Sequence, residues 1–229
     1  MKNIITIDGP SGSGKGTVAS LVANKLGWHL LDSGALYRVL GVAARRSSIL
    51  LDSEQDLCRL ASELDIAFVR NPNTGETDPL LEGENIAPFI RTDEAGQDAS
   101  KVATLSSVRE ALLCRQRAFL REPGLVADGR DMGTIVFPQA PIKIFLTATA
   151  ECRAERRYKQ LKNKGVSANM RALLESIQAR DERDRKRSVA PLVPAEDAVV
   201  IDSSQLSIQA VMNQVLVIAD KKLSNFGET

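Results

Sequence analysis

Apolar and polar positions follow two different periods in the first 46 residues. Residues 4–7 form a short β-branched run, and from Val18 onward apolar side chains recur at helical spacing until Gly27. A second short apolar run at 28–31 precedes another helical pattern over 35–46. Two strand–helix units in so short a stretch predict an α/β fold with a mostly parallel sheet.

The pattern changes after this point. Segment 65–84 contains short apolar runs around the turn-rich sequence NPNTGETDP, which predicts a small insertion of antiparallel strands. Helical spacing returns over 95–120, and a Pro-Gly pair separates it from an apolar strand at 125–127. The remaining expected elements are a strand at 142–146, a charged helix with the sequence ECRAERRYKQLK, a long helix from about Asn169, a strand at 198–201 and a C-terminal helix.

Composition narrows the functional classes. The chain has 229 residues, 43% hydrophobic and 26% charged, and its 30 basic side chains nearly balance 29 acidic ones. This profile is typical of a soluble globular protein. The balanced charges give no strong net electrostatic field of the kind that would indicate binding to nucleic acid or membrane. No segment reaches the roughly 20 apolar residues of a membrane span. The three cysteines lie far apart, so we expect reduced packing residues in a cytoplasmic protein.

One Gly-rich loop carries the strongest chemical signal. It follows the first predicted strand, precedes a predicted helix and fits the pattern G-x-x-x-x-G-K, in which backbone N–H groups and a lysine hold phosphates. A Gly-rich turn with a solvated lysine is the alternative. The residues expected to bind ATP here are Gly9, Pro10, Ser11, Gly12, Ser13, Gly14, Lys15, Gly16 and Thr17.

The end of this loop departs from the general pattern. Gly16 stands where most such loops have serine or threonine, and Thr17 comes one residue later. The sequence GKGT resembles nucleoside monophosphate kinases rather than GTPases. Thr17 is therefore the candidate for a hydroxyl group near Mg²⁺.

Two polar segments follow predicted strands. DSGALYR places Ser33 at the expected N-cap of a helix and Arg38 about one turn into it. DGRDMGT places Arg130 and Asp131 at the carboxyl edge of the sheet, where ligands gather in open α/β folds, with flanking glycines for a sharp turn. A capping serine and a simple Asp-Gly turn are the alternative interpretations.

A third candidate is the charged run RDERDRKR. Arg180, Asp184 and Arg187 share one predicted helix face, while Asp181 and Arg185 are spaced to pair on another. A phosphate acceptor that carries a phosphate of its own needs converging arginines, which this face could supply. A solvated helix with surface salt bridges is the alternative.

Together, GPSGSGKGT, DSGALYR, IRT, VREALL, DGRDMGT and RDERDRKRSVAPLVPA resemble bacterial cytidylate kinases in order and spacing. The resemblance covers nearly the whole chain. It implies an α/β P-loop three-layer fold with a central parallel sheet, a small antiparallel insertion in the monophosphate-binding region and a helical lid. It also implies one domain, 1–229, with a core of about 1–38, 96–150 and 169–229, a monophosphate-binding insertion of about 39–95 and a lid of about 151–168.

The resemblance further implies transfer of the γ-phosphoryl group of Mg·ATP to CMP or dCMP by a monomer. Its catalytic residues would be Lys15, Arg38, Arg130 and Arg187, the last three holding the CMP phosphate. Its CMP-binding residues would also include Ser33, Arg180 and Asp184 at the sugar and Ser100, Arg109 and Asp131 at the base. From the lid, Arg156 and Arg157 would cover the triphosphate, unless they are only surface charges.

Base chemistry agrees with this interpretation. Cytosine offers an amino donor that a carboxylate accepts, whereas uracil would place a carbonyl against it. A kinase for UMP, dTMP or AMP remains the first alternative. A nucleotide-dependent switch that hydrolyses ATP slowly is the second, and it would need no arginines for an acceptor.

Overall fold

The computed structural model describes residues 3–70, 77–163 and 165–224. The expected turn at 71–79 therefore falls mostly outside the described residues. The chain forms two compact units. The first unit comprises Met1–Asp32 and Arg117–Thr229, and the second comprises Ser33–Gln116. The substrate-handling regions expected at about 39–95 and 151–168 stay predictions.

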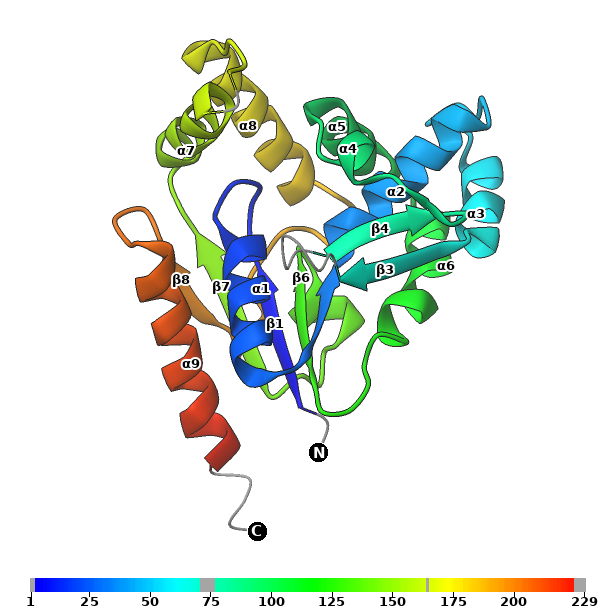
Figure 1. Cartoon of the computed structure of the whole chain (residues 1–229). Coiled ribbons are helices and arrows are strands. Elements are labelled where there is room, and N and C mark those ends of the chain that lie inside the picture. The colour runs from blue at the N-terminus through cyan, green and yellow to red at the C-terminus, as the bar shows by residue number, and fades with distance from the viewer. Residues whose placement is uncertain (1–2, 71–76, 164, 225–229) are drawn as a thin grey trace. The chain divides into compact units, whose positions relative to one another are not determined.

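A five-stranded parallel sheet forms the centre of the first unit (Figure 1). Its strand order is β2-β6-β1-β7-β8. Because neighbouring strands are parallel, the chain must cross over from the end of one strand to the start of the next, usually through a helix. The α/β class and the parallel sheet expected from the sequence are confirmed. The strands are β1 (Ile4–Asp8), β2 (His29–Asp32), β6 (Leu125–Gly129), β7 (Ile142–Thr147) and β8 (Val199–Asp202).

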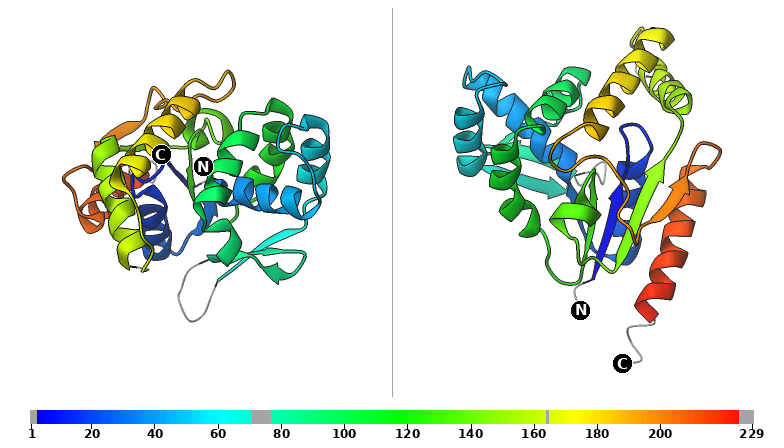
Figure 2. Two further views of the ribbon diagram at one scale, coloured as in Figure 1. Left: turned by 90° about the horizontal axis from the view of Figure 1, so that it is seen from above. Right: turned by 180° about the vertical axis from the view of Figure 1, so that it is seen from behind.

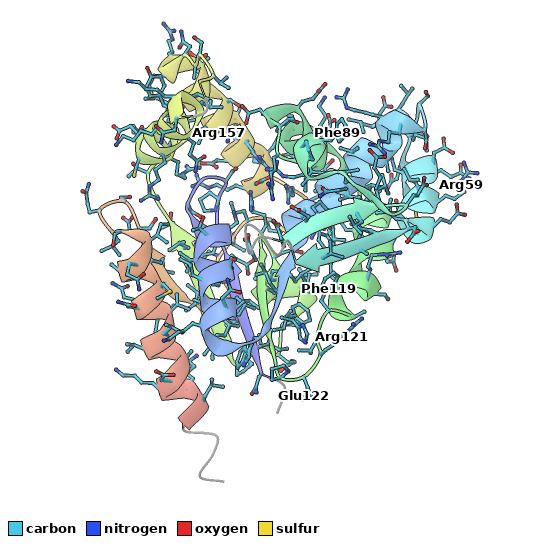
Figure 3. The ribbon with its side chains drawn as sticks, viewed as in Figure 1. Arg59, Phe89, Phe119, Arg121, Glu122 and Arg157 are labelled. Carbon is cyan, nitrogen blue, oxygen red and sulfur yellow. The ribbon has the colours of Figure 1, made fainter. Side chains whose placement is uncertain are left out.

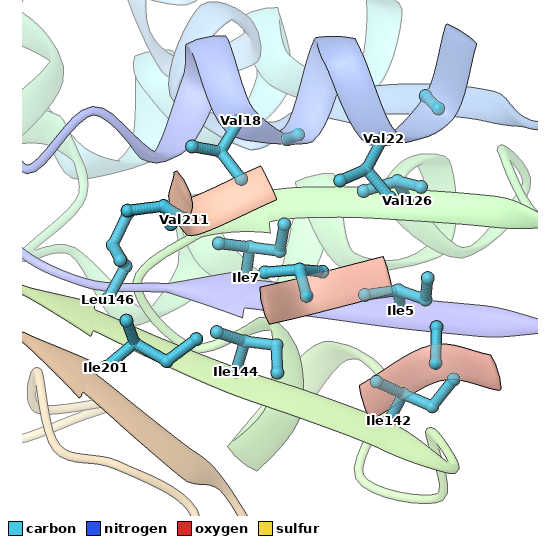
Figure 4. Close-up of a cluster of buried hydrophobic side chains, with 14 residues drawn as sticks. Ile5, Ile7, Val18, Val22, Val126, Ile142, Ile144, Leu146, Ile201 and Val211 are labelled. Atoms are coloured by element: carbon cyan, nitrogen blue, oxygen red, sulfur yellow. The ribbon is translucent and has the colours of Figure 1, made fainter. Parts of the chain in front are cut away.

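Two helices cover one face of this sheet, α1 (Lys15–Leu26) and α9 (Ile208–Ser224). Val18 and Val22 point from α1 toward the strands and pack in one cluster with Ile5 and Ile7 (Figure 4). Burial of such side chains contributes roughly 1.5–3 kcal/mol each, which anchors the helix. The first turn of α1, directly after the Gly-rich loop, is thereby fixed relative to the sheet.

Two further helices of the first unit, α7 (Ala150–Asn163) and α8 (Met170–Arg185), lie side by side (Figure 2). Asn169 caps α8, because its side-chain oxygen accepts the N–H of Ala172 at 3.1 Å. This start agrees with the helix expected from about Asn169. The first two turns of α7 and the last turns of α8 carry several of the candidate arginines and aspartates.

The second unit contains a three-stranded antiparallel sheet of order β3-β4-β5, which confirms the expected insertion. Among its described residues, two clusters of buried apolar side chains are built around α2. Its elements are α2 (Ser33–Arg46), α3 (Glu54–Glu63), β3 (Ile66–Arg70), β4 (Thr77–Leu81), β5 (Glu84–Asn85), α4 (Ala87–Ile90), α5 (Asp93–Val102) and α6 (Ser106–Arg117).

The helical pattern expected as one stretch over 95–120 belongs to two helices, α5 and α6. Helix α5 ends because the N–H of Thr104 bonds back to the carbonyl of Lys101 and its hydroxyl donates to the same oxygen at 2.7 Å. Such local bonds of a threonine compete with helix continuation. The helical periodicity is confirmed, but the prediction of one unbroken stretch is wrong.

Candidate functional site

The Gly-rich loop connects β1 to α1 and depends on its glycines. Gly9, Gly12 and Gly14 have φ values of 153°, 79° and 91°, a region that other residues rarely adopt. A Cβ atom at Gly9 would lie 2.0 Å from the carbonyl oxygen of Leu146 in β7. The backbone therefore takes this conformation only with glycine at these positions, as the phosphate-loop interpretation requires.

Lys15, the first residue of α1, is buried at the end of the loop. Its Nζ donates to the carbonyl of Pro10 at 3.2 Å and lies 3.9 Å from Oδ1 of Asp128. Burial, with repulsion from Arg130, lowers the pKa of Lys15 to about 8, although Asp128 opposes the shift. An ammonium group that lacks full solvation is stabilised strongly by a phosphate, so Lys15 is suited to bind one. The solvated lysine of the alternative interpretation is excluded.

The unusual Gly16 has a local explanation. A Cβ atom there would lie 3.0 Å from Oδ2 of Asp128, which is closer than most Cβ contacts. A serine or threonine would therefore push against the carboxylate that faces Lys15. Thr17, one residue further along α1, is an exposed residue.

Two arginines of α7 contact carbonyl groups of the loop. Arg156 donates to the carbonyl of Ser13 at 3.3 Å and to the hydroxyl of Ser203 at 3.1 Å. Arg153 donates to the carbonyl of Ser11 at 3.0 Å. Arg157 also lies on α7 (Figure 3) and is half-buried. For Arg156, the interpretation as a simple surface charge is therefore wrong.

Arg153 connects α7 to α8 through a buried ion pair with Asp181. Arg153 is 2% exposed, and its guanidinium group pairs with both oxygens of Asp181. The expected pair between Asp181 and Arg185 is therefore wrong, because Asp181 turns inward toward α7 while Arg185 is exposed. A bidentate buried pair holds both helices in one geometry, at the root of the proposed lid.

Asp184 is the centre of an arginine cluster in the first unit. It is 1% exposed and accepts from Arg130 at 3.0 Å and from Arg187. Burial alone would raise the pKa of Asp184, but neighbouring arginine charges, foremost Arg130 and Arg187, hold it below its ordinary value. The solvated-helix interpretation is therefore wrong for this carboxylate.

The helix geometry expected for this cluster needs one correction. Helix α8 ends at Arg185, so Arg187 lies beyond the helix and does not continue its face. Part of the clamp on Asp184 comes from Arg130 after β6, and the charge of Arg180 also lowers the pKa of Asp184. The structure brings Arg130, Asp184 and Arg187 together, as the functional interpretation predicts. The arginines reach Asp184 from the segment after β6 and from the residues after α8, and not from one helix face.

The segment after β6 is a single π-helical turn, Met132–Val136, with the buried Asp131 just before it. The sequence predicts that the glycines around Asp131 allow a sharp turn, but neither Gly129 nor Gly133 has a positive φ. They allow close packing instead, because a Cβ atom would lie 2.8 Å from Met132 at Gly129 and 2.9 Å from Thr6 at Gly133. The polar segment therefore lies directly on the sheet.

Ser33 and Arg38 belong to α2 of the second unit. Ser33 is the first residue of the helix and not its N-cap, and its buried hydroxyl donates to Oε1 of Gln116 at 2.7 Å. The capping interpretation is therefore wrong. Arg38 donates to the carbonyl of Ile90 at 2.7 Å, which fixes its guanidinium group over α4.

The two other candidates in the second unit are both buried. Ser100 lies on α5 and is 1% exposed, and Arg109 lies on α6. Arg109 donates to the carbonyl of Ala103 at 3.3 Å and sits 5.8 Å from the ring centroid of Tyr37. An arginine buried against an aromatic ring is held rigidly, which suits recognition of a planar base.

Sequence reasoning missed four residues that hold the candidates. The sequence pattern indicates only a lid position for Arg153 and a surface pair for Asp181, and it gives no signal at Gln116. Asp8, which is buried below the π-helical turn, was also missed. A polar residue at the last position of a buried strand, next to the phosphate loop, could have drawn attention to Asp8.

Comparison with known proteins decides the family. The family model described as Cytidylate kinase matches residues 5–221. The chain belongs to the cytidylate kinase family. It is 59% identical over 221 residues to the cytidylate kinase of Colwellia psychrerythraea, covering 96% of this chain and 97% of that protein. It is 56% identical over 225 residues to that of Aeromonas hydrophila, covering 98% and 97%.

Among solved structures, a gluconokinase from Sinorhizobium meliloti is similar over 100% of this chain and 97% of its own. Its identity is 15% and its TM-score is 0.49, which is too distant to inform the activity. The resemblance to cytidylate kinases found in the sequence is thus confirmed by close relatives of nearly equal length. Within the described residues, no helix has the length and apolar character needed to cross a membrane.

A kinase family implies phosphoryl transfer from ATP, generally with a divalent metal. In the part of the chain that the structure describes, no three His, Cys, Asp or Glu side chains gather as a metal cage. This is compatible with Mg²⁺, which in kinases keeps waters and substrate phosphates among its ligands. The hydroxyl of the exposed Thr17 and the carboxylate of Asp128 beside Gly16 are oxygen ligands of the kind that Mg²⁺ prefers.

Proposed function

We propose that this protein transfers the γ-phosphoryl group of Mg·ATP to CMP or dCMP, giving CDP or dCDP and ADP. The observation that carries the proposal is the arginine-clamped Asp184, which lies in the same unit as the buried Lys15 of the phosphate loop. A slow nucleotide switch needs the lysine alone. A set of half-buried arginines around a buried carboxylate is suited to an acceptor that carries its own phosphate.

On the donor side, the proposed ATP-binding residues are those of the loop from Gly9 to Thr17, with Arg156 and Arg157. The loop supplies backbone N–H groups at the start of α1, where the helix dipole favours anions. Lys15 neutralises charge on the transferring phosphoryl group. Mg²⁺, when bound with ATP, would neutralise further phosphate charge, and Thr17 and Asp128 would hold it or its waters.

On the acceptor side, Arg38, Arg130 and Arg187 are proposed to hold the CMP phosphate. Ser33, Arg180 and Asp184 are proposed to contact the sugar. No general base is needed, because the attacking phosphate oxygen is already ionised near pH 7. Positioning and charge neutralisation then account for the catalysis. We further propose that the enzyme acts as a cytoplasmic monomer without nucleic-acid or membrane partners.

For the base, the proposed readers are Ser100, Arg109 and Asp131. An ionised carboxylate at Asp131 would accept the amino group of cytosine and repel the carbonyl of uracil. We expect kcat/KM for CMP to exceed that for UMP by roughly 100-fold or more, because a buried acceptor left unpaired is costly. A coupled assay of ADP formation with CMP, dCMP, UMP, dTMP and AMP measures this ratio.

Asp131→Asn tests which group reads the base. Its amide can donate to uracil, so the ratio of CMP to UMP use should fall at least about tenfold. Arg117→Lys is a control, because Arg117 donates to carbonyl groups of the same turn without being a proposed reader. A preference for UMP or AMP in the wild-type enzyme would contradict the proposed substrate.

The proposed lid, about 151–168, should close over the triphosphate. Only Arg153 and Ala154 are buried in α7, so its later turns have few contacts that would oppose local opening. We expect fast hydrogen exchange after Tyr158 in the free enzyme and strong protection with an analogue that links ATP and CMP. Peptides around the buried Arg153 should be protected in both states. Equal exchange after Tyr158 with and without the analogue would contradict a lid.

A further inference from the structure

Asp8 is a buried carboxylate that none of the proposed substrate contacts includes. It is the last residue of β1 and is 5% exposed. Its Oδ1 accepts the N–H of Met132 and its Oδ2 accepts the N–H of Gly133, both at 2.8 Å. Two successive peptide groups bound by two oxygens of one carboxylate cannot rotate without breaking a bond. Asp8 therefore fixes the start of the π-helical turn.

The alternation of β1 explains why Asp8 reaches this turn. Ile5 and Ile7 face the cluster under α1, so Thr6 and Asp8 face the opposite side of the sheet. The turn approaches that side closely, since a Cβ atom at Gly133 would lie 2.9 Å from Oγ1 of Thr6 and 3.4 Å from Oδ2 of Asp8. Backbone N–H groups can therefore reach the carboxylate directly.

The environment makes Asp8 an unusual choice for purely structural support. Burial raises the pKa of Asp8 to about 7, the bonds from the two N–H groups oppose this shift, and nearby Asp131 and Asp128 reinforce it. From β7, Lys143 also approaches this turn, but its Nζ is bound to Asp197 and to the carbonyl of Pro138. The chain keeps an aspartate at a position where burial and two nearby carboxylates disfavour its ionised form.

We propose that Asp8 is a positioning residue for the acceptor nucleotide, acting through the peptide groups of Met132 and Gly133 on Arg130 and Asp131. These two side chains directly precede the bound peptide groups in the chain. Arg130 is also held by Asp184, so the segment is fixed from the sheet on one side and from α8 on the other. This inference rests on the proposed function, which assigns Arg130 and Asp131 to CMP.

Asp8→Asn tests the proposal with the smallest change in shape. The amide keeps one acceptor but turns an NH₂ group toward the second N–H, so one bond is replaced by a contact between two donors. We expect KM for CMP to rise about tenfold, the scale of losing a bond to a charged group. The KM for ATP should stay within about twofold, because the loop glycines and Lys15 are unchanged.

Thr6→Val is the matched control. Thr6 lies on the same strand and the same face, two residues from Asp8, and is fully buried. Its replacement should leave both KM values unchanged. Wild-type KM for CMP in Asp8→Asn, or an equal rise in KM for ATP and CMP, would overturn the positioning role. A lower melting temperature with unchanged kinetics would show a structural role only, and would overturn it too.

A double-mutant cycle with Arg130→Met separates this inference from the proposed function. If Asp8 acts through Arg130, Asp8→Asn should raise KM for CMP clearly less in the Arg130→Met background than in the wild type. Fully additive effects would overturn that route. If Arg130→Met alone leaves KM for CMP unchanged, the proposed phosphate role of Arg130 fails, whatever Asp8→Asn does.

A measurement on the wild-type enzyme covers the case in which Asp8→Asn does not fold. Because the N–H groups of Met132 and Gly133 are bound before any nucleotide arrives, they should exchange slowly in the free enzyme and change little when CMP binds. Fast exchange that slows only with CMP would mean that the nucleotide orders the turn, and the proposal would be wrong.

Discussion

Lys15→Met should lose on the order of 10³-fold or more in kcat while keeping the fold. Charge stabilisation of a transferring phosphoryl group is worth several kcal/mol, and methionine supplies none of it. The fold should survive because methionine has a similar volume and removes a desolvated charge that Arg130 repels, although some stability should be lost because the buried Asp128 loses the charge that faces it. Steady-state kinetics with saturating ATP and CMP, together with a thermal melt, measure both effects.

Lys143→Met is a suitable control for this prediction. Lys143 is similarly buried in the first unit but pairs with Asp197 and the carbonyl of Pro138. Its loss should lower stability and leave kcat within a few-fold of the wild type. A folded Lys15→Met protein with kcat within tenfold of the wild type would contradict the role of Lys15 in the phosphate loop.

Asp184→Ala should lower both stability and activity. Removing one member of a buried ion-pair cluster leaves the other charges uncompensated, which costs about 3–5 kcal/mol, and here Arg130 and Arg187 would be left. The two arginines would also lose their orientation, so KM for CMP should rise and kcat should fall, with KM for ATP nearly unchanged. Chemical denaturation and steady-state kinetics with CMP as the varied substrate test both parts.

Glu182→Ala is the control on the same helix. Glu182 is exposed and pairs with Lys186, so its loss should change stability by no more than about 0.5 kcal/mol and leave the kinetics unchanged. Wild-type KM and kcat in folded Asp184→Ala would refute its acceptor role.

The stability that Asp184 contributes should depend on pH. The pKa of Asp184 is held below its ordinary value in the folded protein. Its contribution is therefore complete above the unfolded value of about 3.8 and is lost as the pH falls through the folded value. The difference in unfolding free energy between the wild type and Asp184→Asn should shrink in acid. A difference that stays constant down to strongly acidic pH would contradict this assignment.

Local patterns were enough to predict most of the fold. Buried strands such as Ile4–Asp8 read as continuous apolar runs, and Gly27 ends α1 with a φ of 67°, as its position in the pattern suggested. The break between α5 and α6 was missed, because it depends on the hydroxyl of Thr104 bonding back to Lys101 rather than on a change in apolar spacing.

The candidate site was less predictable because its side chains are held by tertiary partners. Spacing on a helix suggested that Asp181 would pair with Arg185, but packing of α7 against α8 gives it Arg153 instead. Likewise, the carboxylate of Asp8 meets its two N–H groups across more than 120 residues of chain. Periodicity reports which face is buried, and it contains no information about which distant group lies opposite.

The hydrogen bond between Ser33 and Gln116 has a consequence for how this chain can change in evolution. The two residues are 83 positions apart and are the first and last of the second unit. The chain therefore enters and leaves this unit at two positions that lie next to each other. Strands β2 and β6, which precede and follow it, pair directly in the sheet of the first unit. Lengthening a closed loop costs little, about 0.6 kcal/mol per doubling. Insertions within the second unit can therefore accumulate as a module, while the strands that carry the phosphate loop keep their register.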